Sequence, residues 1–169
     1  MQPSLVAFDL DGTFWENRGG RYRLRPDIER ILQDVVRRGL EIAIASNHND
    51  KDEAETFFET ERVEIEGRSR RLMDLVTHKC FIIEPGSKIA HFEKIHRNSS
   101  IAYCEMLFFD DLEKHSNVEE KGVTFIQVDG DDGLDWATYK RGLARISKAI
   151  LNHYEDGNGD WATYVSYAV

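Results

Sequence analysis

The chain has 169 residues, a net charge of -9 and two cysteines, values that argue against a disulfide-stabilised scaffold and a nucleic-acid-binding protein. The length suits one domain whose core needs no disulfide framework. The negative charge argues against a nucleic-acid-binding surface, although a local cation still attracts a phosphate group. No apolar run approaches a membrane span, and the first strand begins too early for a signal peptide. We therefore expect a cytoplasmic protein whose Cys80 and Cys104 are reduced.

The first predicted strand covers residues 5–8 and ends abruptly in the sequence DLDGT, residues 9–13. Asp9 and Asp11 lie on the same face of an extended chain. Two carboxylates this close raise each other's pKa unless a cation or a proton transfer uses them. The pattern indicates a carboxylate nucleophile, a second carboxylate that serves as acid and base, and a hard cation between them.

The sequence DLDGT also has two plainer interpretations. A surface turn is the first, since Asp-Gly pairs are common in loops. A calcium loop of the EF-hand type is the second, but it requires glycine at Phe14 and an acidic residue at Gly20. The calcium loop is therefore excluded, and the motifs further along the chain favour catalysis over a turn.

The next segment, residues 16–25, is polar and basic, and Gly19-Gly20 predicts a tight turn or a small hairpin tip. A solvated loop is the favoured interpretation, and a flap whose arginines meet an anionic substrate is the alternative. A helix follows from Pro26 to Gly39, because its apolar residues recur at the spacing of one buried face.

The second predicted strand, residues 40–45, ends in Ser46 and Asn47, which offer hydroxyl and N–H donors to an anion. Residues 53–58 predict a helix. Residues 60–71 are highly charged and are interpreted as an irregular surface segment that leads into a helix around 72–76.

The third predicted strand, residues 80–83, is followed by a turn and by a helix that Ser87 caps. Lys88 stands in the first turn of this helix, where the helix dipole favours acidic residues instead. A residue placed against its local preference is a mild indication of function.

The fourth predicted strand, residues 106–109, is wholly apolar and ends in Asp110-Asp111, which repeats the pattern of the first strand. A fifth strand covers residues 123–128 and a last helix residues 135–154. Alternating strands and helices predict a parallel, doubly wound α/β sheet, whose ligands bind beyond the carboxyl ends of the strands. We expect one domain over residues 1–150 and a tail, residues 151–169, that packs on it or on a partner.

The chemical groups at these strand and helix ends are, in order, Asp9/Asp11, Ser46, Lys88 and Asp110/Asp111. This order resembles the four-motif signature of the haloacid dehalogenase (HAD) superfamily. The sequences DLDGTFW, EPGSKIAHFEKIH and MLFFDD resemble its magnesium-dependent phosphatase branch, similar to class IIIC acid phosphatases. The resemblance covers residues 5 to 150 and is weakest across 50–79.

The resemblance implies a Rossmann-like fold of three layers, with a mostly parallel five-stranded sheet and a minimal cap or none. It also implies Mg2+ and the hydrolysis of a phosphomonoester on a small molecule or a protein. In this comparison Asp9 is the nucleophile that forms an aspartyl-phosphate, and Asp11 protonates the leaving oxygen and then acts as base. Thr13 supports the loop near the phosphate, and Ser46 and Asn47 hold phosphate oxygens.

The same resemblance implies the cationic side of the site. Lys88 neutralises the phosphate and the nucleophile. Asp110 binds Mg2+ together with Asp9 and the backbone carbonyl of Asp11, and Asp111 assists directly or through water. Phosphoryl transfer needs positioning and charge neutralisation above all, and a lysine with a divalent cation supplies both.

Two departures from this branch concern the substrate more than the chemistry. The branch has Ser-Arg where this chain has Ser46-Asn47, so a bidentate contact to phosphate or substrate is lost. The branch also has an acidic residue where this chain has Leu112. Two other functions stay open on the sequence: a different reaction at Asp9, such as dehalogenation or phosphomutase chemistry, and a non-catalytic binding module.

Overall fold

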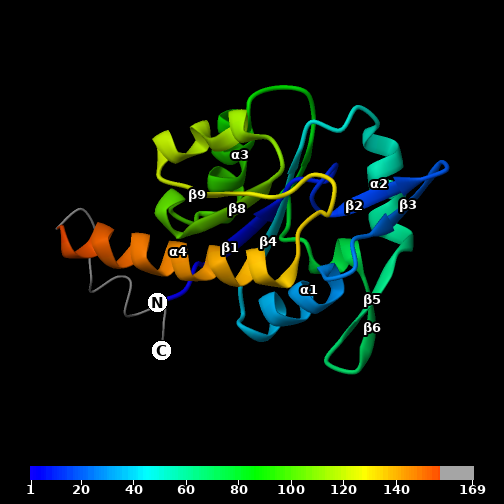
Figure 1. Cartoon of the computed structure of the whole chain (residues 1–169), viewed down its shortest axis with the longest axis horizontal. Helices are drawn as coiled ribbons and strands as arrows, with labels where there is room; N and C mark the ends of the chain where they lie inside the picture. Colours follow the sequence, from blue (N-terminus) through cyan, green and yellow to red (C-terminus); the bar gives the residue numbers. More distant parts are fainter. Residues whose placement is uncertain (157–169) are drawn as a thin grey trace.

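Five short apolar runs form the central sheet of the computed structural model, which describes residues 1–156 (Figure 1). The strands are β1 (Leu5–Phe8), β4 (Glu41–Ser46), β7 (Phe81–Ile83), β8 (Met106–Asp110) and β9 (Thr124–Gln127). Their order is β7-β4-β1-β8-β9, and every neighbouring pair is parallel. β1 is central, with Leu5 opposite Glu41 on one side and Met106 on the other. The predicted Rossmann-like α/β fold with a five-stranded sheet is confirmed.

Helices cover both faces of this sheet because successive side chains of a strand point to opposite faces. Val6 and Phe8 of β1 pack in the same cluster as residues of α1 (Ile28–Arg37) and α4 (Trp136–Glu155). Leu5 and Ala7 pack on the other face with residues of α3 (Lys88–Ser99) and of the 3-10 helix η3 (Glu113–Lys121). The result is three layers with β1 buried in the middle (Figure 1).

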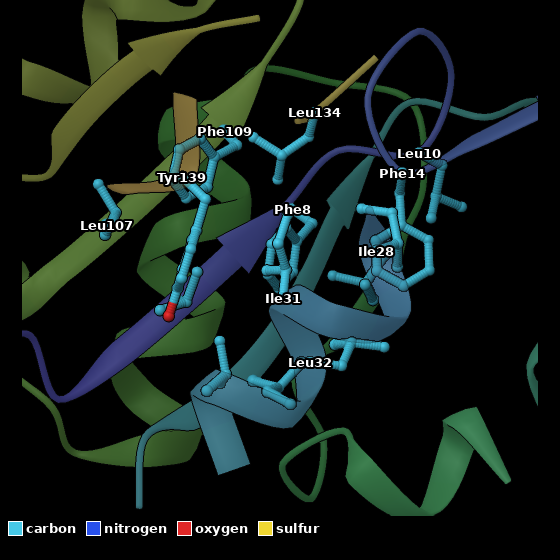
Figure 2. Packing of buried hydrophobic residues seen from close by; sticks show 14 of the residues in the cluster. Phe8, Leu10, Phe14, Ile28, Ile31, Leu32, Leu107, Phe109, Leu134 and Tyr139 are labelled. Carbon is cyan, nitrogen blue, oxygen red and sulfur yellow. The ribbon is translucent and has the colours of Figure 1, made fainter. Parts of the chain in front are cut away.

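The core reaches to the end of β1, as Figure 2 shows around Phe8. The ring of Phe8 lies 5.5 Å from that of Phe14 and 6.0 Å from that of Phe109, between centroids. Ile31 of α1 is fully buried in the same cluster. Packing at this density leaves the residue after Phe8, which is Asp9, little freedom to move.

A polar contact joins α1 to α4 inside this layer. The Tyr139 hydroxyl of α4 donates to Asp34 Oδ2 of α1 at 3.0 Å, and Arg38 Nε donates to the same oxygen at 2.6 Å. Arg37 also pairs with Asp34. Burial raises the pKa of Asp34, but the hydrogen bonds from Arg38, Arg37 and Tyr139 outweigh it and bring the pKa below its usual value.

Tyr139→Phe is expected to lower the free energy of unfolding by about 1–2 kcal/mol, because a buried carboxylate loses one of its donors. Urea denaturation should show a lower midpoint with an unchanged slope. Because its pKa is lowered in the folded protein, the Asp34 carboxylate stabilises the fold at pH values above the ordinary carboxyl pKa, and this contribution is lost as the pH falls and Asp34 becomes protonated. The difference in the free energy of unfolding between Tyr139→Phe and wild type should therefore shrink at acidic pH. A difference that stays constant down to strongly acidic pH would contradict this assignment.

Two small hairpins lie outside the main sheet. The first pairs β2 (Trp15–Arg18) with β3 (Arg21–Leu24) between β1 and α1, and its tip is the predicted Gly19-Gly20 turn, with φ of 61° and 83°. Such positive φ values suit glycine and give the turn that matches the twist of a hairpin. This pairing is the small hairpin that Gly19-Gly20 indicated in the sequence.

The second hairpin corrects the prediction of an irregular surface segment over residues 60–71. β5 (Arg62–Ile65) pairs with β6 (Arg68–Arg71) through a two-residue turn, in which Glu66 and Gly67 have φ of 51° and 74°. Val63 and Ile65 are buried and alternate with exposed charged residues, which is a strand pattern. All four residues of β6 are exposed, so its sequence has no alternation of apolar and polar residues that would predict a strand.

The remaining elements are short. α2 (Lys51–Thr60) begins at Asp50, whose carboxylate accepts from the N–H of Glu53 at 2.9 Å. The helix predicted at 72–76 is a 3-10 helix, η1 (Leu72–Leu75), and η2 (Tyr103–Glu105) precedes β8. Of the tail 151–169, α4 includes the first residues, and 157–169 lie outside the described residues. Among residues 1–156, no helix is both long and apolar enough to cross a membrane.

Candidate active site

The carboxyl ends of β1, β4 and β8 meet at one edge of the sheet, where the chain order reverses on either side of β1. A pocket of about 260 Å3 opens there. It is lined by Asp9, Asp11, Gly12, Ser46, Asn47, His48, Lys88, Asp111, Leu112, Lys114 and His115. The structure thus brings together the candidate residues that lie far apart in the sequence.

Asp9 continues β1 and is almost completely buried at the floor of this pocket, with 6% of its surface exposed. Its N–H donates to the carbonyl of Phe109 at 2.9 Å, so β8 fixes its backbone. Burial raises the pKa of Asp9 to about 6, against the opposing charge of Lys88 and with a further contribution from the Asp110 carboxylate. Lys88 favours the ionised form of Asp9, because its ammonium group lies 2.8 Å from Asp9 Oδ1.

Lys88 is a buried cation between two carboxylates. Its Nζ donates to Asp9 Oδ1 at 2.8 Å and to the carbonyl of Ala45 at 2.5 Å, and it lies 3.2 Å from Asp110 Oδ2. The side chain has no exposed surface. The N-cap of α3 is Ser87, whose hydroxyl accepts from the N–H of Ala90 at 3.2 Å. These contacts explain why a lysine stands in the first turn of α3 against the helix dipole, because its ammonium group pairs with Asp9 and Asp110.

The carboxylates of Asp9, Asp110 and Asp111 can each place an oxygen within 4.8 Å of the others. Asp110 is fully buried, accepts from the N–H of Leu112 at 2.8 Å and lies 2.7 Å from His115 Nδ1. Hydrogen bonds of this kind orient the carboxylates of a metal site. The set contains oxygen donors only, which are the ligands of a hard cation such as Mg2+. The residues present therefore fit that metal.

Asp111 is held close to the backbone of two glycines. A Cβ on Gly12 would lie 2.6 Å from Asp111 Oδ2, and one on Gly130 would lie 3.0 Å from it. Gly12 also has a φ of 69°, which larger residues rarely adopt. Glycine at position 12 therefore allows the loop after β1 to approach the Asp110-Asp111 pair.

Asp11 differs from Asp9 because its side chain is 57% exposed and faces the pocket opening. Trp15 Nε1 donates to its Oδ1 at 2.8 Å. His48 Nδ1 lies 2.8 Å from its Oδ2, and His48 Nε2 lies 3.2 Å from Glu53 Oε2. Burial lowers the pKa of His48, but the hydrogen bonds and charges of Asp11 and Glu53 outweigh burial and raise the pKa above its ordinary value.

The three other predicted residues lie in different surroundings. Ser46 ends β4 and is buried, and its hydroxyl accepts from the N–H of His48 at 3.2 Å. Asn47 is exposed and lines the pocket. Thr13 is fully buried behind the loop and is not part of the pocket lining, and its carbonyl accepts from the N–H of Leu134 at 2.9 Å.

Sequence reasoning gave no role to His48, Glu53, Lys114 or His115. His48 and His115 contact candidate carboxylates, and Lys114 adds a basic side chain to the pocket lining. A weak signal existed for the last two, because His115 and Lys114 follow Asp110-Asp111 by a few residues. His48 stands in a polar turn sequence, SNHND, which has no signal of its own.

A parallel sheet with an acidic cluster and a buried lysine at its carboxyl edge is the arrangement that the resemblance to the HAD superfamily implied. Residues 16–149 match the model of a family described as acid phosphatase. The chain therefore belongs to the acid phosphatase family, and the resemblance inferred from the motifs is confirmed.

Curated relatives cover most of the chain. Magnesium-dependent phosphatase 1 of Homo sapiens is 29% identical over 172 residues, which cover 87% of this chain and 89% of the human protein. A HAD-like hydrolase superfamily protein of Schizosaccharomyces pombe is 30% identical over 149 residues, with coverage of 74% and 85%. Each match covers at least 85% of the relative's own length.

Solved structures share the fold. The N-terminal part of a Bacteroides fragilis protein, containing a phosphatase domain and complexed with Mg, superimposes with a TM-score of 0.62 at 23% identity. That match covers 84% of this chain and 40% of the other. A HAD-superfamily hydrolase from Ehrlichia chaffeensis gives a TM-score of 0.60 at 13% identity, with coverage of 88% and 98%.

Proposed function

We propose that this chain is a Mg2+-dependent phosphomonoester hydrolase that works through an aspartyl-phosphate on Asp9. The observation that carries the proposal is the buried Lys88, 2.8 Å from Asp9 and 3.2 Å from Asp110, beside three carboxylates able to share a cation. A carboxylate approaches a phosphate dianion only where cations neutralise the repulsion. The relative named magnesium-dependent phosphatase 1 supports the same activity.

The covalent step uses the two carboxylates of the DLDGT loop. An Asp9 oxygen forms a bond to phosphorus while the bond from phosphorus to the leaving oxygen breaks, and Asp11 gives its proton to that oxygen. Asp11 then takes a proton from water, whose oxygen attacks the phosphorus of the aspartyl-phosphate and frees inorganic phosphate and Asp9. The different surroundings of the two residues suit these roles, since Asp9 is buried beside Lys88 and Asp11 faces the opening.

The metal would be held by Asp9, Asp110 and Asp111, with the backbone carbonyl of Asp11 as a further ligand. When bound, Mg2+ supplies positive charge that offsets the charges of the phosphate and the nucleophile. His115 and the N–H of Leu112 hold the Asp110 carboxylate in place for this purpose.

The phosphate group is received by Lys88, Ser46 and Asn47, and Thr13 supports the loop from behind. Lys114 provides a positive charge at the rim of the pocket. The resembled phosphatase branch has an arginine at the position of Asn47, so Lys114 would supply the positive charge that Asn47 lacks. A lysine contacts phosphate as a point charge and without the two parallel bonds of an arginine.

The substrate is a phosphorylated small molecule or a phosphorylated protein side chain. The β2–β3 hairpin is short, so the pocket stays open to either. We also propose a cytoplasmic location, which suits the free Cys80 and Cys104.

Hydrolysis of 4-nitrophenyl phosphate tests this function. Purified protein is expected to release nitrophenolate when Mg2+ is present. Hydrolysis should stop when EDTA is in excess and resume when Mg2+ is restored, because Asp9 and the phosphate repel each other without the metal. Loss of at least about 100-fold with EDTA is expected. Activity that survives EDTA, or halide release from a 2-haloacid without Mg2+, would contradict the proposal.

A further inference from the structure

His48 is enclosed beside the active site without a part in the steps described above. The residue is 9% exposed. Its ring lies between two carboxylates, with Nδ1 2.8 Å from Asp11 Oδ2 and Nε2 3.2 Å from Glu53 Oε2. Trp15 and Tyr22 pack against the imidazole in T-shaped geometry, with ring centroids 5.1 Å and 5.7 Å away.

Asp11 depends on neighbours for its orientation, because most of its side chain is open to solvent. Trp15 holds one oxygen at 2.8 Å, and His48 holds the other at the same distance. An exposed carboxylate held at one oxygen only is free to swing about its χ torsions. A proton donor displaced by about 1 Å loses much of its effect on the rate.

We propose that His48 is a positioning residue, which holds the Asp11 carboxylate toward the leaving oxygen and is itself held by Glu53. The inference rests on the proposed function, since it assigns to Asp11 the proton transfer described there. His48 acts through its hydrogen bond and keeps its Nδ1 proton throughout. The proton that reaches the leaving oxygen comes from Asp11, and the one that replaces it comes from the attacking water.

Two substitutions separate positioning from mere packing. His48→Leu keeps the bulk of the ring and removes the donor, whereas His48→Asn keeps an N–H close to the place of Nδ1. His78→Leu is the matched control, because His78 is an exposed residue in the loop before β7. Each variant is assayed with Mg2+ on phenyl phosphate, whose leaving group is strongly basic, and on 4-nitrophenyl phosphate, whose leaving group is weakly basic.

We expect His48→Leu to lower kcat on phenyl phosphate by about 10- to 100-fold, because that leaving group needs the proton. The same variant should lose less than about threefold on 4-nitrophenyl phosphate, with KM nearly unchanged on both. His48→Asn should recover most of the kcat, and His78→Leu should match wild type. An equal loss on both substrates, a change in KM alone, or no recovery in His48→Asn would overturn the proposal.

A structural readout does not depend on turnover. Crystal structures of the two variants should show the Asp11 carboxylate in place in His48→Asn and turned away in His48→Leu. An Asp11 that stays in place without the imidazole would overturn the positioning role. The proposed function fails instead if wild type hydrolyses neither ester, or if Asp11→Asn is as active as wild type on both esters. In either case the crystal structures still decide whether His48 orients Asp11.

Discussion

Asp9→Asn is expected to abolish phosphate ester hydrolysis, with kcat falling by more than about 10⁴-fold, because the amide cannot form the acyl-phosphate. The fold should persist, since the amide has the same shape and Lys88 keeps Asp110, 3.2 Å away, as its partner. The measurement is steady-state hydrolysis of 4-nitrophenyl phosphate with Mg2+, together with thermal unfolding.

The control is Asp132→Asn, which makes the same change in an exposed turn and should leave kcat unchanged. A second measurement places the nucleophile directly. Borohydride reduces an acyl-phosphate, so wild type quenched during turnover should carry the reduced residue at position 9. A reduced residue at position 11, or substantial turnover by Asp9→Asn, would contradict the assigned role.

Lys88→Met is expected to lower both activity and stability. The free energy of unfolding at neutral pH should fall by about 3–5 kcal/mol, because Asp9 and Asp110 would remain buried without their cation. Hydrolysis should fall by at least about 100-fold, since Lys88 offsets the charge of the nucleophile and the phosphate. Both effects follow from one ammonium group that has no exposed surface.

The pH dependence of this loss has a definite sign. Burial already raises the pKa of Asp9 to about 6 although Lys88 opposes it, and removal of Lys88 raises that pKa further. An acid whose pKa is raised in the folded state destabilises the fold above that pKa and less as it takes up its proton. The loss of stability in Lys88→Met should therefore narrow as the pH falls toward about 6, below which Asp9 takes up its proton in wild type as well, and Mg2+ should reduce the loss at pH 7.

Chemical denaturation at several pH values, with and without Mg2+, measures these effects. Lys148→Met is the matched control, because Lys148 is exposed on α4, and its stability should equal that of wild type. A Lys88→Met protein as stable as wild type at pH 7 would show that the buried pair adds nothing to stability.

Local patterns in the sequence were sufficient to predict the central sheet and the positions of Asp9 and Asp110 at strand ends. The apolar runs before Asp9 and Asp110 predicted buried strands, and both are fully buried in the structure. The β5–β6 hairpin was missed because β6 consists of exposed residues, three of them arginines, so its pairing with β5 left no hydrophobic pattern.

By itself, the sequence determined which groups stand at the ends of strands, since alternation of apolar runs and helices places every carboxyl end at one edge. Only the tertiary structure decided which side chains meet there. Lys88 reaches Asp9 across 79 positions of the chain, and His48 reaches Asp11 across 37. The physical reason is that such contacts depend on how α3 and the β4 loop pack against β1, and no local pattern records that packing.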